Sequence, residues 1–348
     1  MQRHKLHSLR NLHLMFELAE IGRQKPLIHV ISNAVTLTDV VNAILASGGV
    51  AIGADAPEEA AEITRLADGL VLNIGTPSRA KREAMLTAGK TANAKGIPVV
   101  LDPVGAGASV FRRQILAELL QNVRFTCIRG NLSEVWTLAG IAEAAGVMDA
   151  SGTGRQSGAG NAGRSECPDH SGTVLEDRTS RGVEDSAGAL TGEKLAALER
   201  LSESLCTVLA VTGAEDFVIC GTDVRRIHGG SPLQKRMTGS GCMLSGLTAG
   251  ALAAEYMALR GGGSCITAEI NPALKDTRDR PKQSRKPDAA AAGLLREAAQ
   301  TVETLIRAYD RAAEEAAERV RQQDAGMGTF HTALLDAISK WPVTEFED

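Results

Sequence analysis

Leu70–Ile74 (LVLNI) and Val99–Leu101 (VVL), joined by the helical segment Arg79–Ala94, form the stretch that decides the fold. Each short apolar run is typical of a buried strand, and the segment between them is long enough for a crossover helix. The same alternation begins at Pro26 and continues to Ala139. Apolar strands that alternate with helices predict an α/β fold with a mostly parallel sheet covered by helices on both faces.

Further elements extend this pattern along the chain. We expect strands at 27–31, 50–52, 125–128, 207–211 and 217–220, a helix over 36–46, and another helix from Pro57 onward. Ligands of such sheets bind beyond the carboxyl ends of the strands. The polar residues that directly follow each strand are therefore the candidate site residues.

The composition narrows the class of protein. The 348 residues are 43% hydrophobic and 23% charged, which suits a globular chain with a full core. Aromatic residues make up 3% and the net charge is −4, which argues against nucleic acid or anionic membranes as partners. The six cysteines show no CxxC pair or metal-ligand spacing, and no signal peptide or membrane-length apolar run is recognised. A cytoplasmic protein with reduced thiols is expected.

Two segments interrupt the pattern. Residues 151–188 are rich in Gly, Ser, Asp and Arg, and residues 261–286 end in a basic cluster at 278–286. Neither segment has enough aliphatic side chains to offset the entropy of ordering it. We interpret 1–348 as a single domain with these two flexible insertions. The basic cluster is a solvated loop or a contact for an acidic partner.

The most informative motif for function is Met237–Gly246 (MTGSGCMLSG), which leads into an apolar helix expected over Leu244–Ala254. The first amides of a helix have no internal partners, and the helix dipole favours negative charge there. Gly239 and Gly241 allow close backbone approach and positive φ, and Cys242 stands at the mouth of this pocket. The motif is not a Walker A loop. It predicts a site for a phosphate or an oxyanion, and the alternative is a buried turn with a core cysteine.

Acidic side chains follow two of the expected strands. Asp102 ends one strand before a glycine-rich turn, and Asn131 and Glu134 follow another. A helix that begins at Asn131 places Asn131 and Glu134 on one face, so all three residues could converge on one water-ligated Mg²⁺. The alternative is that Asn131 caps the helix and Glu134 completes a capping box. Both interpretations can hold at once.

Three more strand ends carry polar groups. Arg129 follows an apolar strand, where a guanidinium is costly unless it meets an anion, either an ATP phosphate or a structural carboxylate. Thr212 and the glycine after it could bind a nucleotide through the threonine hydroxyl and the backbone of the glycine. Asn33 ends the first strand with an amide that could orient a small polar ligand. His29, within that strand, is interpreted as a core histidine with satisfied hydrogen bonds.

Together these motifs resemble the hydroxyethylthiazole kinase family, which has the ribokinase-like fold, a three-layer αβα sandwich. The resemblance runs over about 26–140, 192–258 and 328–337. It is most specific at 72–76, 102–107, 128–131 with Glu134, and 238–242. Both low-complexity segments fall outside it.

The resemblance implies ATP- and Mg²⁺-dependent phosphorylation of the primary alcohol of 4-methyl-5-(2-hydroxyethyl)thiazole, a salvage step towards thiamine. It also implies a homotrimer with substrate sites between subunits. By position it assigns Asp102 and Glu134 to Mg²⁺, and Cys242 to catalysis. It assigns ATP to five residues: Arg129, Thr212, Asn131, Ser240 and Gly241. It assigns the thiazole alcohol to Gly53, Gly239 and Asn33. A helix N-terminus lowers the pKa of a thiol, but a neighbouring nucleotide opposes this, so Cys242 is expected to be a weak base.

Two departures from the family bear on the exact substrate. Gly53 stands where the family usually has methionine, and Val30 stands where asparagine is common. Hydroxymethylpyrimidine kinase is the nearest alternative, but it has Thr-Pro-Asn where this chain has residues 129–131 as Arg-Gly-Asn. ADP-dependent repair enzymes for hydrated nicotinamide nucleotides share the fold but have Asp in place of Cys242. A non-catalytic ligand-binding relic is the last alternative, and the retained acidic residues argue against it.

Overall fold

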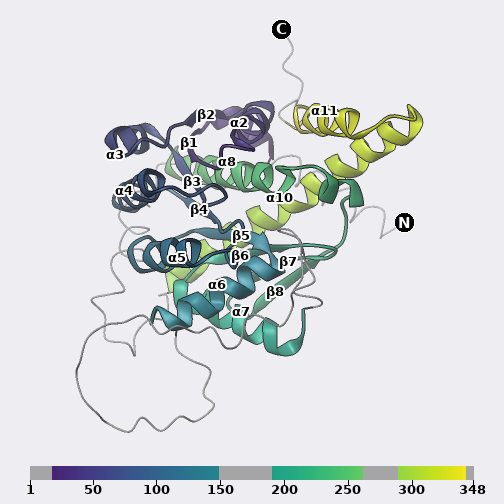
Figure 1. Ribbon diagram of the computed structural model, residues 1–348. Coiled ribbons are helices and arrows are strands. Elements are labelled where there is room, and N and C mark those ends of the chain that lie inside the picture. Colours follow the sequence, from purple (N-terminus) through teal and green to yellow (C-terminus); the bar gives the residue numbers. More distant parts are fainter. Residues whose placement is uncertain (1–17, 149–189, 262–288, 342–348) are drawn as a thin grey trace, which may run out of the picture.

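The computed structural model describes residues 18–148, 190–261 and 289–341 (Figure 1). The predicted insertion 151–188 lies outside the described residues. So does 261–286, apart from Gly261, which ends a helix. The interpretation of 1–348 as one domain with two insertions therefore stays a prediction.

The described strands form one sheet in the order β2-β1-β3-β4-β5-β6-β7-β8. Their bounds are β1 Leu27–Ile31, β2 Val50–Gly53, β3 Gly69–Asn73, β4 Val99–Asp102, β5 Cys127–Asn131, β6 Val208–Thr212, β7 Asp216–Cys220 and β8 Asp223–Ile227. The pairs from β2 to β6 are parallel, which confirms the predicted mostly parallel sheet. Strand β7 pairs antiparallel with β6, and β8 pairs antiparallel with β7. Only 213–215 separate β6 from β7, and a parallel return needs a longer crossover.

Helices cover both faces of the sheet and complete a three-layer αβα sandwich (Figure 1). On one face lie α2 Leu37–Ala46, α8 Ser240–Gly261, α10 Ala289–Gln322 and α11 Met327–Ile338. On the other lie α3 Pro57–Leu66, α4 Arg79–Lys95, α5 Val110–Asn122, α6 Leu132–Ala144 and α7 Gly192–Leu205. Alternate side chains of each strand serve the two cores. Val71, for example, packs on the α8 side, and its neighbours Leu70 and Leu72 pack on the other.

Helix α8 crosses the middle of its layer. Among the described residues, only Ser240–Arg260 is long and apolar enough to span a membrane, but 78% of its most apolar window is buried inside the fold. This burial is typical of the central helix of a globular protein. The helix begins at Ser240, four residues before the predicted start at Leu244. Its first turn therefore includes the small residues of the motif.

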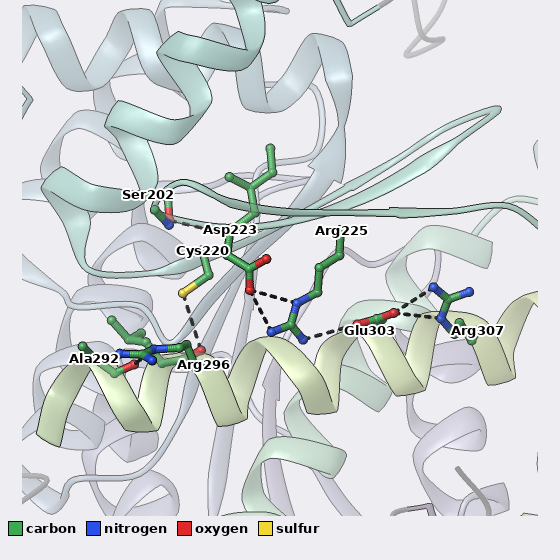
Figure 2. A network of polar contacts seen from close by, with 11 residues as sticks. Ser202, Cys220, Asp223, Arg225, Ala292, Arg296, Glu303 and Arg307 are labelled. Atoms are coloured by element: carbon green, nitrogen blue, oxygen red, sulfur yellow. Dashed lines mark hydrogen bonds and ion pairs between the residues drawn. The ribbon is translucent and has the colours of Figure 1, made fainter. Parts of the chain in front are cut away.

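An ion pair joins helix α10 to the antiparallel edge of the sheet (Figure 2). Arg225 of β8 lies between two carboxylates, with Nη2 2.9 Å from Asp223 Oδ2 and Nη1 3.3 Å from Glu303 Oε2. Since Glu303 belongs to α10, its contact with Arg225 links the helix to β8. The next helical turns of α10 bring Tyr309 and Asp310 towards the carboxyl edge of the sheet.

Candidate active site

The cluster of predicted site residues centres on Cys242, in the first turn of α8, whose residue surface is 8% exposed. Asn73, the last residue of β3, donates from Nδ2 to Cys242 Sγ at 3.2 Å. Asn33, just after β1, donates from Nδ2 to the same sulfur at 3.5 Å and to Asn73 Oδ1 at 3.2 Å. The start of α8 therefore meets the carboxyl ends of β1 and β3. The structure thus brings Asn33 and Cys242 together.

Asp102, at the end of β4, is fully buried beside this thiol. Its Oδ2 accepts hydrogen bonds from Asn73 Nδ2 and Ser245 Oγ, both at 2.8 Å, whereas its Oδ1 has no partner among the described residues. Burial raises the pKa of Asp102, and the charge of Arg129 opposes the shift. A buried carboxylate oxygen without a partner is costly and is therefore a natural place for a cation or a donor.

Glu134, in the first turn of α6, accepts a hydrogen bond on each oxygen. Oε1 accepts from the Gly105 amide at 2.9 Å, and Oε2 accepts from the Asn131 amide at 3.0 Å. Asn131 Oδ1 in turn accepts from the Glu134 amide at 2.9 Å. The capping box is therefore confirmed. Burial and the nearby charge of Asp102 raise the pKa of Glu134 to about 7, so the two carboxylates lie close enough to repel each other.

The two carboxylates fit a hard divalent cation. Mg²⁺ is usually held by one or two carboxylates, with water and phosphate oxygens completing the shell. Asp102 Oδ1 is buried and unpartnered, and each oxygen of Glu134 keeps a second lone pair. In the described ranges, no group of three or more His, Cys, Asp or Glu side chains is arranged to hold a metal. A cation at this place would therefore need oxygens from water or a bound phosphate.

Arg129 points from β5 to the N-terminus of α8. Its Nη2 donates to Thr212 Oγ1, at the end of β6, at 2.5 Å. A Cβ atom at Gly241 would lie 2.2 Å from Arg129 Nη1, so the guanidinium packs directly against the backbone of the first helical turn. No ion pair between described residues joins Arg129 to a carboxylate, which favours an external anion over the structural alternative. Its charge lowers the pKa values of Asp102 and Cys242 against the effect of burial.

The turn before α8 depends on a glycine. Gly239 has φ +89°, and a Cβ atom there would lie 3.0 Å from Thr36 Cγ2 and 3.2 Å from Asp39 Oδ2. The turn therefore rests closely on the start of α2. Ser240 Oγ lies 3.1 Å from the Tyr309 hydroxyl, which also donates to the Ser240 carbonyl at 2.8 Å. The side chain of Ser240 is thus engaged with α10, and its contribution to a ligand would come from the backbone.

Two other residues singled out in the sequence make their nearest contacts elsewhere. Gly53 ends the edge strand β2, and the nearest atom to a Cβ there would be Leu37 Cδ1, at 3.2 Å. His29 Nδ1 lies 2.9 Å from Thr64 Oγ1, and its Nε2 lies 2.8 Å from the Ala54 carbonyl. Burial lowers the pKa of His29. The interpretation of His29 as a core histidine with satisfied nitrogens is confirmed.

The thiol of Cys242 is not activated. Burial and the charge of Asp102 raise its pKa to about 11, and the partly opposing effects of neighbouring donors and Arg129 do not reverse this. The net shift in the pKa of Cys242 is therefore upward, in spite of its place in the first turn of a helix. The thiol is neutral near pH 7, and the role of Cys242 as a weak base stays a prediction.

The family model for the hydroxyethylthiazole kinase family matches residues 18–164 and 159–266. The chain belongs to the hydroxyethylthiazole kinase family. The predictions of this family and of an alcohol kinase are thereby confirmed, and the described sheet and its two helical layers confirm the predicted αβα sandwich. Membership also decides against the pyrimidine kinase and the nucleotide-repair alternatives.

Relatives within the hydroxyethylthiazole kinase family are similar over most of their length. The hydroxyethylthiazole kinase of Exiguobacterium sp. is 38% identical over 241 residues, 69% of this chain and 78% of the relative. That of Desulfovibrio desulfuricans is 41% identical over 226 residues, 65% of this chain and 69% of the relative. The solved hydroxyethylthiazole kinase of Pyrococcus horikoshii superposes with a TM-score of 0.63 at 26% identity, and the match covers 94% of this chain and 93% of that one.

Sequence reasoning missed some residues that this hydroxyethylthiazole kinase family member places at the site. Ser245 binds Asp102, and its position three residues after Cys242 on one helix face was the available signal. Tyr309 and Asp310 come from α10, beyond the region that the family model matches. Two polar residues on the buried face of a long helix were the only signal for them.

Proposed function

We propose that the protein transfers the γ-phosphoryl group of ATP to the primary alcohol of 4-methyl-5-(2-hydroxyethyl)thiazole, a salvage step towards thiamine. Family membership supports the reaction and the alcohol. The observation that carries the proposal in this chain is the meeting of Asp102, Arg129 and Cys242 at the start of α8. Phosphoryl transfer asks a protein mainly for positioning and for neutralisation of charge, and this arrangement supplies both.

The phosphate groups would lie over the first turn of α8. The amide of Met243 makes the first bond of the helix, to the Gly239 carbonyl at 2.8 Å. The amides of Gly241 and Cys242 donate to no backbone carbonyl of the described residues, so they face the mouth of the turn. Arg129 adds a full positive charge against the same turn. Two amides and a guanidinium together suit a polyanion.

Mg²⁺ would be held by Asp102 and Glu134, with the unpartnered Oδ1 of Asp102 as the principal protein oxygen. When bound, the ion would neutralise charge on the phosphate oxygens. Asn73 and Ser245 keep Asp102 in place through its other oxygen. Thr212 keeps the guanidinium of Arg129 at the opposite side of the cluster.

The alcohol would lie beside Asn33, Gly239 and Cys242, with Leu37 next to Gly53 as part of an apolar wall. The Asn33 and Asn73 amides fix the sulfur of Cys242, which can accept a hydrogen bond from the attacking hydroxyl. Because the thiol is neutral, this contact orients the hydroxyl more than it removes the proton. A modest turnover rate is expected.

The assembly and location are part of the same proposal. A homotrimer with sites between subunits would cover apolar side chains that one chain leaves open around α2 and β2. Among the described residues Val35 is 67% exposed, Leu45 50% and Val50 42%. Light scattering on the purified protein should give a species of three 36.5 kDa chains. A monomer at micromolar concentration would contradict the proposed trimer. Recovery of the protein outside the cytoplasmic fraction of cells would contradict the proposed location.

A coupled assay of ADP release tests the reaction directly. The panel contains the thiazole alcohol, a hydroxymethylpyrimidine and a simple primary alcohol, each with ATP and with either Mg²⁺ or EDTA. We expect turnover with the thiazole alcohol, dependence on Mg²⁺, and little turnover with the other alcohols. Equal or higher kcat/KM with the pyrimidine would overturn the substrate. Tight thiazole binding without ADP release would favour the ligand-binding relic.

A further inference from the structure

We infer that Asp310 of α10 is a positioning residue, whose carboxyl group donates a hydrogen bond to Asp216 and thereby holds the Thr212–Gly213 end of β6 in place for the nucleotide. The inference deepens the proposed function and rests on it, since it takes the end of β6 to be part of the ATP site.

Asp216 determines the shape of the turn after β6. Its Oδ1 accepts a hydrogen bond from the Gly213 amide at 2.8 Å, which closes the short connection between β6 and β7. Thr212 directly precedes this turn and accepts the hydrogen bond of Arg129 at 2.5 Å. A shift of Asp216 would therefore move the hydroxyl that positions the guanidinium.

Asp310 reaches Asp216 from the facing helix in a place closed to water. The two residues are 7% and 8% exposed, and their carboxyl groups interact side chain to side chain. Asp310 Oδ2 accepts no hydrogen bond from a described residue, so no donor other than a shared proton joins the two carboxyl groups. The backbone at Gly229 and Gly230 lies against the same carboxyl. A Cβ atom would be 3.0 Å from Asp310 Cβ at Gly229, and 2.9 Å from Oδ1 at Gly230, where φ is +82°. Two carboxyl groups in contact at such a place share one proton.

The surrounding charges decide which group keeps the proton. Burial raises the pKa of Asp310, and the charges of Asp216 on β7 and Glu314 on α10 raise it further, with only Arg307 opposing them. Burial also raises the pKa of Asp216, but the Gly213 amide, Arg129 and Asp310 each oppose that shift. Asp310 is therefore the donor and Asp216 the acceptor.

The loop between β8 and α8 adds no further charge against this pair. It presents Gly229, Gly230 and Gln234 to the Asp310 carboxyl. His228 of this loop lies 3.3 Å from Glu215, the residue before Asp216, at the surface.

The same turn of α10 also holds the other wall of the proposed phosphate site. Tyr309, the neighbour of Asp310, donates to the Ser240 carbonyl at 2.8 Å. One helix thus contacts the start of α8 and the end of β6. The ion pair between Arg225 and Glu303 in Figure 2 joins α10 to β8, so the helix that contacts both walls is itself tied to the sheet.

The experiment compares Asp310→Asn and Asp310→Ala with the full-length wild-type chain between pH 6 and 9. KM for ATP and kcat are measured with the thiazole alcohol and Mg²⁺. For the wild type, KM for ATP should rise with pH, because loss of the shared proton leaves two repelling carboxylates. Asp310→Asn keeps a permanent amide donor, so its KM should stay near the low-pH value of the wild type. Asp310→Ala should raise KM for ATP about tenfold over the low-pH value of the wild type, the effect of one lost hydrogen bond, and change kcat less. This raised KM should not vary with pH, because the variant has no shared proton to lose.

Glu318→Gln is the matched control, since it replaces a carboxyl group by an amide at an exposed site on the same helix. It should reproduce the wild-type profile. The inference is overturned if Asp310→Asn follows the wild-type rise in KM, or if Asp310→Ala leaves KM unchanged. Thermal unfolding over the same pH range tests the contact between Asp216 and Asp310 independently of enzyme activity. The wild type should lose stability with rising pH and Asp310→Asn should not, and parallel curves overturn the inference even if no alcohol is phosphorylated.

Discussion

The guanidinium of Arg129 and the backbone of Gly241 are in such close contact that a single added carbon would overlap them, at 2.2 Å from Nη1. One residue comes from the middle of the sheet and the other from the first turn of a helix 112 positions later in the chain. Their contact makes the helix N-terminus and a fixed positive charge one surface. The absence of a side chain at 241 is therefore a requirement of the proposed phosphate site.

Gly241→Ala should displace Arg129 while the fold is kept. The new methyl group pushes the guanidinium away from the first turn of α8, so KM for ATP should rise about tenfold or more, as for the loss of a charged hydrogen bond. The measurement is steady-state kinetics with the thiazole alcohol. Gly250→Ala, in the same helix, is the control, because no atom beyond the neighbouring helix backbone lies within 4 Å of the added carbon. That variant should keep normal kinetics and gain about 0.5–1 kcal/mol of unfolding free energy. Equal kinetics for both variants would contradict the role given to Arg129.

Asp102→Asn should separate stability from activity. The change removes a fully buried charge whose pKa is raised by burial, while the asparagine oxygen can still accept from Asn73 and Ser245. We expect an unfolding temperature equal to or above that of the wild type, and a loss of turnover of about hundredfold or more. Calorimetry and the ADP-release assay measure the two effects. A large fall in unfolding temperature would mean that Asp102 serves the fold and that its free oxygen has no cation to bind.

Cys242→Ala should keep measurable activity. The pKa of about 11 leaves the thiol neutral at pH 7, so the substitution removes a hydrogen-bond acceptor and only a weak base. We expect kcat to fall by no more than about hundredfold, the lower end of the range for general base catalysis. Cys127→Ala serves as a comparison, because that thiol is buried in β5 within the hydrophobic core. It should lower stability and leave kcat unchanged. Complete inactivity of Cys242→Ala would refute the weak-base role.

His29 should make the protein less stable in mild acid. Burial lowers the pKa of His29 from its ordinary value of 6.5, so the folded state holds the neutral ring more firmly than the unfolded chain does. Its contribution to stability is therefore fully present above pH 6.5 and is lost as the pH falls through the lowered value. His29→Gln should flatten the acid side of the curve of unfolding free energy against pH. His228→Gln, at an exposed position, should keep the wild-type slope. An unchanged slope in His29→Gln would show that other groups cause the acid loss.

The sequence allowed the main part of the fold to be predicted because buried parallel strands are continuous apolar runs. The runs at 27–31 and 50–52 agree with β1 and β2 within one residue. Strand β8 escaped prediction because it is an exposed edge strand with charged residues such as Asp223 and Arg225. The direction of β7 depended on the length of a turn rather than on its apolar residues.

The candidate site was predictable to a similar degree. Residues that directly follow strands, such as Asp102 and Asn33, are brought to one edge by the topology of any parallel sheet. The roles of Glu134 oxygens as acceptors for two backbone amides, one of them from a different loop, could not be predicted. Gly53, placed with the substrate by resemblance, contacts Leu37 at the edge of the sheet, and its role stays a prediction.

By itself, the sequence determined the layers of the sandwich, the edge of the sheet that carries polar residues, and the small-residue turn before α8. These follow from local chemistry, since hydrophobic periodicity and glycine act within a few residues of chain. Only the tertiary structure decided that Asp102 keeps one free oxygen, that Cys242 is a neutral thiol, and that Asp310 meets Asp216. The physical reason is that burial and the approach of charges depend on groups far apart in the chain, and both change the free energy of ionisation.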